Sequence, residues 1–172
     1  MPSTSMKASS VLGAEYLREL ESEVRATREC LEKVPMDKSD WKPHDKSMTL
    51  GYLALLVADI PRWIQYTIEK SVIDFATYEQ FNAATAKELV THFEKSVEAA
   101  KSALQHVTDD GLKETFYLKN DGQELFSSPK DESIMSSINH MVHHRGQLTV
   151  YLRLNDIAVP SIYGPSANSG GF

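Results

Sequence analysis

Two histidines separated by three residues, His140 and His144, are the side chains in this sequence best suited to metal chemistry. Residues four apart on a helix share a face, with their Cβ atoms about 5–6 Å apart. Two imidazoles at this spacing can each give one nitrogen to a single divalent ion, at about 2.0–2.1 Å for zinc. Such a site needs a third protein ligand, which another helix has to supply.

Four segments with apolar residues at intervals of three and four predict the helices that would position these histidines. Thr85 and Glu88 form a capping-box signature, and Pro129 occupies a favourable first helical position. Pro61 should bend the second helix or end its first half, because it lacks a backbone donor. The predicted helices cover residues 10–34, 48–70, 85–107 and 129–155.

The segments outside these helices predict a flap and a tail around a bundle. Two short β-prone runs between Thr115 and Phe126 flank Asn120-Asp121-Gly122, a hairpin-turn signal. Residues 72–84 form a long connector, and residues 156–172 are too rich in Pro and Gly for regular structure. We therefore expect one all-α domain over residues 1–172, a four-helix bundle with a small hairpin before its last helix.

Composition excludes several classes of protein. The formal net charge is −6 and no stripe of Lys and Arg stands out, which argues against nucleic-acid binding. No apolar run reaches the 18 or so residues of a membrane span, and the N-terminus lacks the apolar stretch of a signal peptide. The single cysteine, Cys30, falls in a helical pattern and is expected to be a half-buried small apolar residue. These features favour a cytoplasmic setting.

Several stretches of the chain are similar to DinB-like proteins. Residues 140–148 (HMVHHRGQL), continued by 151–154 (YLRL) and 159–166 (VPSIYGPS), resemble the C-terminal signature of that family. Three shorter stretches resemble the segments before its second and last helices: 41–44 (WKPH), 47–50 (SMTL) and 122–126 (GQELF).

The resemblance implies an up-down-down-up four-helix bundle, often a homodimer, that commonly binds nickel or zinc through three histidines. It also implies a relation to metal-dependent transferases and hydrolases that use a thiol cosubstrate. Two of the three ligands map onto His140 and His144. The third maps onto Leu56, which cannot ligate a metal.

Three interpretations of the site stay open. In the first, Asp59 or His44 replaces the missing ligand, and zinc or nickel generates a nucleophile. In the second, His140 and His144 are the hydrogen-bonded remains of a lapsed metal centre. In the third, the bundle is a metal-free module, acting as a homodimer, that binds a small molecule, serves a stress response or only packs.

Residues near the histidine pair carry further expectations. Gln147 and Tyr151 extend the same helix face and are candidates for contacting a cofactor or substrate. Arg145 points away from that face and should pair with acidic side chains. Gly146 suggests that another backbone or the tail packs closely. On the third helix, His92 is expected at the surface or at the boundary of the core.

Overall fold

The computed structural model describes residues 10–169; the expectations for the N-terminal segment 1–9 and for residues 170–172 lie outside this range. The helices are α1 (Val11–Glu32), α2 (Leu50–Glu69), α3 (Ala86–His106), α4 (Asp109–Lys113) and α5 (Lys130–Leu154), with a 3-10 turn at Met36–Lys38. The strands are β1 (Val72–Asp74), β2 (Thr115–Asn120) and β3 (Gln123–Pro129).

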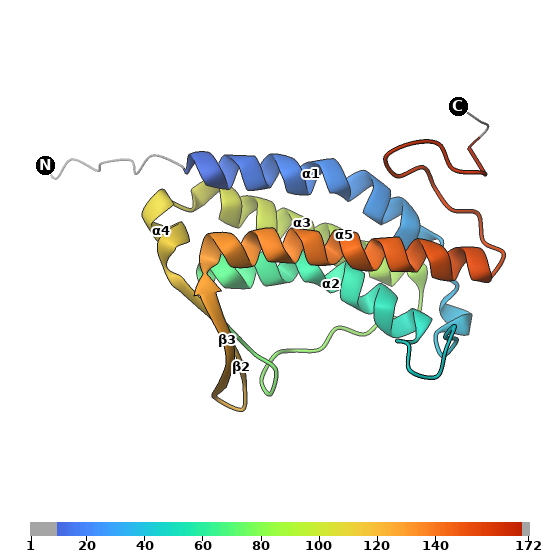
Figure 1. Ribbon diagram of the computed structural model, residues 1–172, viewed down its shortest axis with the longest axis horizontal. Helices are drawn as coiled ribbons and strands as arrows, with labels where there is room; N and C mark the ends of the chain where they lie inside the picture. Colours follow the sequence, from blue (N-terminus) through green and yellow to red (C-terminus); the bar gives the residue numbers. More distant parts are fainter. Residues whose placement is uncertain (1–9, 170–172) are drawn as a thin grey trace, which may run out of the picture.

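The four long helices form a bundle in which α1 and α5 run in one direction and α2 and α3 in the other (Figure 1). The helix α2 packs against α3 and α5, and α1 packs against the same two helices from the opposite side. This is the up-down-down-up order, so the predicted fold is confirmed. None of the helices in residues 10–169 is long and apolar enough to cross a membrane.

Local signals in the sequence account for where the helices begin. The Thr85 hydroxyl accepts the Glu88 N–H and the Glu88 carboxylate accepts the Thr85 N–H, which is the predicted capping box. At the start of α2 the Thr49 hydroxyl accepts the Tyr52 N–H. The prediction that Pro61 could end the first half of α2 is wrong, because the helix continues to Glu69. Pro61 is buried within α2, and the helix continues through it although the proline lacks one backbone donor.

A three-stranded sheet lies beside the bundle, and its strands β2 and β3 project below the left end of the bundle in Figure 1. The predicted hairpin is present as β2 and β3, and Gly122 takes a positive φ of 75° at its turn. The strand β1 pairs in parallel with β2, so the connector after α2 begins as part of this sheet. Asp74 holds the turn by accepting the backbone N–H groups of Asp121 and Gly122.

The C-terminal tail is fastened to the bundle through Arg145, whose side chain is 2% exposed. Its guanidinium contacts the Glu23 carboxylate at 2.5 Å and donates to the Thr27 hydroxyl at 3.1 Å. It also donates to the Tyr163 hydroxyl at 2.7 Å, and Tyr163 donates in turn to Glu23. The expected pairing of Arg145 with an acidic side chain is therefore confirmed, and it ties α1, α5 and the tail together.

Candidate functional site

The two histidines lie on one face of α5, as their spacing predicts. Their Nε2 atoms are 2.8 Å apart and their ring centroids are 4.5 Å apart. His144 is buried and its Nδ1 lies 2.7 Å from the Gln147 Oε1. The helix thus brings together three of the side chains that the sequence singled out.

These contacts determine where the protons sit when both rings are neutral. Gln147 Oε1 can only accept, so His144 carries its proton on Nδ1 and accepts through Nε2. His140 then donates through Nε2, which leaves its Nδ1 as an acceptor with no hydrogen bond to any residue from 10 to 169. Burial, with the neighbouring imidazoles of His144 and His143, lowers the pKa of His140 below 6.5 and favours this neutral form.

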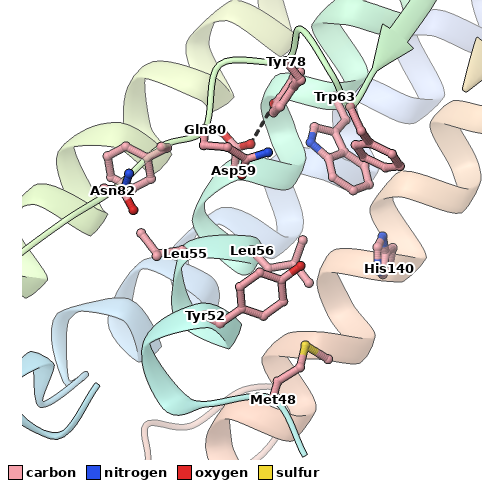
Figure 2. A pocket seen from close by; sticks show the side chains of 12 residues that line it. Met48, Tyr52, Leu55, Leu56, Asp59, Trp63, Tyr78, Gln80, Asn82 and His140 are labelled. Atoms are coloured by element: carbon pink, nitrogen blue, oxygen red, sulfur yellow. Dashed lines mark hydrogen bonds between the residues drawn. The ribbon is translucent and has the colours of Figure 1, made fainter. Parts of the chain in front are cut away.

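Leu56, the position to which the resemblance assigns the third ligand, lies on the side of α2 that faces the histidine pair. Figure 2 shows its side chain pointing from α2 toward His140 on α5, whereas Leu55 points to the side of Asn82. The aliphatic side chain of Leu56 packs against the core cluster and offers no lone pair. Leu56 therefore faces the histidine pair but cannot serve as a ligand.

Asp59, the suggested substitute ligand, is engaged elsewhere. The Tyr78 hydroxyl donates to its Oδ2 at 2.7 Å, and the Arg62 Nε lies 2.9 Å from Oδ1. His92 contacts Oδ1 through Nε2 at 2.6 Å. Burial would raise the pKa of Asp59, but hydrogen bonds from His92, Tyr78 and Arg62 outweigh this and lower it below 3.8. His92, whose side chain is 17% exposed, lies at the boundary of the core as expected, and it takes part in this network with Phe81 stacked on its ring.

The other candidate residues are also placed apart from the histidine pair. His44 lies in an exposed loop and accepts the Lys46 N–H. The Tyr151 hydroxyl donates to the Met48 carbonyl at 3.2 Å, and its ring packs edge-on against Trp41. Within residues 10–169, no group of three or more His, Cys, Asp or Glu side chains is arranged to hold a metal ion.

The donor set consequently does not fit the metal that the resemblance implies. A tetrahedral zinc ion with Zn–N distances of about 2.0–2.1 Å separates its nitrogens by about 3.3–3.4 Å. The two Nε2 atoms are closer than this because they share a hydrogen bond, and Leu56 and Asp59 supply no third donor.

A cavity of about 430 Å³ opens between α2, α5 and the connector that follows β1. We call it the connector cavity. Aliphatic and aromatic side chains make up most of its wall, and polar groups from Asp59 and His140 reach its surface. Its lining residues are Met48, Tyr52, Leu55, Leu56, Asp59, Trp63, Phe75, Tyr78, Gln80, Phe81, Asn82 and His140 (Figure 2).

A second cavity of about 550 Å³ lies between the sheet and the first half of α5, and we call it the sheet cavity. Trp63 and His140 line both cavities, with ring centroids 5.6 Å apart. The Trp63 Nε1 is buried and has no hydrogen-bond partner in the part of the chain that is described. The sheet cavity is lined by Trp63, Thr67, Ile73, Phe116, Leu118, Phe126, Ser128, Glu132, Ser133, Met135, Ser136, Ser137 and His140.

Sequence reasoning did not single out the connector as a wall of the site. Phe75, Tyr78 and Phe81 recur every third residue in a segment with no other periodic pattern. Aromatic residues at regular intervals in a polar connector are the signal that could have indicated packing against the bundle. Tyr78 in particular joins the connector to Asp59 and Arg62.

Comparison with known proteins agrees with this architecture. The chain is 29% identical over 157 residues to an uncharacterized protein, YrdA, of Bacillus subtilis (strain 168), over 88% of this chain and 87% of that protein. A DinB-like protein (yjoa) from Bacillus subtilis has a similar structure, with a TM-score of 0.66, 18% identity, and coverage of 88% of this chain and 99% of that one. A DinB-like protein from Bacillus cereus ATCC 10987 gives a TM-score of 0.66 at 25% identity, over 87% and 97% of the two chains.

The family model is matched over almost the full length. The DinB family model matches residues 3–170, which include all four long helices and the C-terminal tail. The chain therefore belongs to the DinB family.

Proposed function

We propose that this protein binds a small, mostly apolar organic molecule in the connector cavity without a metal ion. The observation that supports this proposal is the chemistry of the cavity wall beside the histidine pair. Leu56 presents an aliphatic side chain to the cavity, and one ring nitrogen of His140 has no hydrogen-bond partner among residues 10–169. A site built in this way can recognise a ligand through apolar contact and one directed hydrogen bond.

The size and lining of the cavity set limits on the ligand. A volume of about 430 Å³ is within the range of small-molecule sites, which span roughly 300–1,000 Å³. Each square ångström of apolar ligand surface removed from water contributes about 25 cal/mol. Tyr52, Trp63 and Phe75 present ring surface to the cavity, which favours an aromatic or alicyclic body.

The polar groups of the cavity select a ligand that donates a hydrogen bond. The neutral His140 ring accepts through Nδ1, and the Asp59 carboxylate stays ionised because its pKa is lowered. A carboxylate ligand would meet a lone pair and a negative charge, so we expect an alcohol, an amine or an amide. The unpaired Trp63 N–H would match an acceptor on the same ligand once a small rotation of the indole exposes it.

The metal-dependent thiol chemistry of related proteins is the competing hypothesis. In that chemistry the bound metal lowers the pKa of its ligand and so generates the nucleophile. Here the residues that would hold such an ion make hydrogen bonds to protein groups instead. We therefore favour metal-free ligand binding over metal-dependent thiol transfer as the function of this site.

A fluorescence titration tests the proposal. The probe is N-phenyl-1-naphthylamine, a neutral aromatic amine whose emission rises in apolar sites, added to the full chain in excess EDTA. We expect saturable binding of one probe per chain. Leu56→Trp, which fills the cavity, should weaken binding by about tenfold or more, equivalent to about 1.4 kcal/mol.

The matched control is Val11→Trp, at an exposed position of α1 far from the cavity, and it should bind the probe like the parent. Binding that appears only when zinc or nickel replaces EDTA would overturn the proposal. Equal affinities in Leu56→Trp and the parent, or no saturable binding, would overturn it as well.

A further inference from the structure

The sheet cavity has an apolar floor that the register of the strands builds. Ile73 of β1 and Phe126 of β3 both pair with Leu118 of β2, so these three side chains form a row across one face of the sheet. Phe116, two residues before Leu118, points to the same face. All four side chains line the cavity, so this face of the sheet is turned toward α2 and α5.

The mouth of the sheet cavity is also apolar. Phe126 and Met135 line it and are 54% and 47% exposed, whereas Ile73 and Phe116 deeper in the floor are 2% and 6% exposed. A bound apolar molecule would cover the exposed part of Phe126 and Met135, which is favourable because it removes apolar surface from water. The volume of about 550 Å³ is within the range of small-molecule sites.

Thr67 gives the interior of this cavity one available polar group. The residue is 1% exposed and lines the cavity, and its hydroxyl makes no hydrogen bond to any residue from 10 to 169. By contrast, the Thr27 hydroxyl donates to the Glu23 carbonyl one turn earlier in α1, and the hydroxyls of Ser128 and Ser133 pair with each other at 2.6 Å. A buried hydroxyl is unfavourable without a partner, so that of Thr67 is free to pair with a molecule in the cavity.

The charge of the cavity wall comes from Glu132. This exposed carboxylate forms no ion pair with residues 10–169, and the described residues that line the cavity include neither Lys nor Arg. His140 adds no positive charge at neutral pH, because burial lowers its pKa below 6.5. A carboxylate together with the aromatic rings of Trp63, Phe116 and Phe126 offers an organic ammonium ion both charge pairing and cation–π contact.

We propose that the sheet cavity is a second ligand site, separate from the connector cavity, and that it binds a protonated organic amine. The ammonium group lies at the mouth beside Glu132, and an aromatic or alicyclic body packs on the floor around Leu118. A hydroxyl or similar group at the far end of the ligand pairs with Thr67. An anion would meet Glu132 without any compensating cation, and the net charge of −6 disfavours it further.

Isothermal titration calorimetry of the full chain with tyramine, in excess EDTA, tests this site. Tyramine carries an ammonium group and a phenol at opposite ends of an aromatic body, and we expect one molecule to bind per chain. Glu132→Gln should weaken binding by about tenfold or more. The matched control is Asp131→Asn, which removes the same charge from the neighbouring residue outside the cavity wall and should change little. The analogue 3-(4-hydroxyphenyl)propionate, with a carboxylate in place of the ammonium, should not bind measurably.

The connector cavity is distinguished by Leu56→Trp. Leu56 lines the connector cavity and not the sheet cavity, so this variant should bind tyramine like the parent. It should lose affinity only for a ligand of the connector cavity. The two proposals can therefore fail separately.

Thr67→Val tests the interior contact, because valine has nearly the same shape and lacks the hydroxyl. The parent should bind tyramine about fivefold more tightly than phenethylamine, which has no phenol hydroxyl, and Thr67→Val should bind the two amines equally. The variant should not have a lower Tm than the parent, since the Thr67 hydroxyl has no hydrogen bond within the fold to lose.

Four results would overturn the proposal. They are the absence of saturable tyramine binding, binding of the carboxylate analogue as tight as that of tyramine, equal weakening by Asp131→Asn and Glu132→Gln, and a preference for tyramine that Thr67→Val retains. Loss of tyramine binding in Leu56→Trp but not in Glu132→Gln would place the amine in the connector cavity and overturn it as well.

Discussion

Replacing Leu56 with histidine should turn the histidine pair into a zinc site. Leu56 points from α2 toward His140, whose Nε2 lies 2.8 Å from that of His144 (Figure 2). A third imidazole at this place gives three nitrogen ligands and an open fourth position, the arrangement found at many catalytic zinc sites. We expect the variant to bind zinc and the parent to bind it poorly.

The size of the effect follows from the geometry of the pair. Zinc requires the two Nε2 atoms to move apart by about 0.5 Å, which breaks their hydrogen bond at a cost of about 1 kcal/mol. Free zinc at a hundred times the dissociation constant stabilises the folded state by about 2.7 kcal/mol. For a chain of this length, that corresponds to a rise in Tm of about 5–10 °C. The parent, with two ligands, should shift by less than about 2 °C.

Differential scanning fluorimetry with and without zinc chloride measures these shifts, and elemental analysis of the dialysed protein gives the metal content. The matched control is Leu55→His, which places the same imidazole one residue earlier, on the side of α2 that faces Asn82. It should lose stability like Leu56→His and gain little from zinc. Leu56→His combined with His144→Ala should also lose the zinc effect.

Two results would refute this reasoning. If zinc stabilises the parent as strongly as Leu56→His, and His144→Ala abolishes the effect, then the parent has a third ligand other than the residues considered above. If Leu56→His and Leu55→His respond equally, then Leu56 does not face the histidine pair. The first result would favour the metal-dependent hypothesis over metal-free binding.

Three further predictions concern stability. Arg145→Met should lower the free energy of unfolding by about 3–5 kcal/mol in urea denaturation, because it leaves the Glu23 carboxylate without its cation; Arg145→Met with Glu23→Leu should recover most of this loss. Tyr78→Phe removes the hydroxyl that donates to Asp59 and should cost about 1–2 kcal/mol in the same assay. The pKa of His140 is lowered in the folded chain, so the free energy of unfolding of the parent should fall as the pH drops below 6.5. The contribution of this group is at most about 1.4 kcal/mol per pH unit, and His140→Gln should make the free energy of unfolding depend less on pH.

The sequence alone determined the parts of the fold that depend on neighbouring residues. Apolar residues that recur at intervals of three and four positions predicted the long helices. The capping box at Thr85 predicted where α3 begins, and the Asn120-Asp121-Gly122 turn predicted where the hairpin forms. The four-residue spacing of His140 and His144 placed both rings on one face, because helix geometry alone sets that relation.

Only the tertiary structure decided what those residues contact. Asp59 is held by Tyr78 from the connector and His92 from α3, 19 and 33 residues away, so its carboxylate is not turned toward α5. Arg145 meets Glu23 across more than a hundred residues. The strand β1 is three residues long and exists because β2 pairs with it. Periodicity fixes which side chains share a face, but the partner of that face depends on how distant segments pack, and no local pattern encodes that choice.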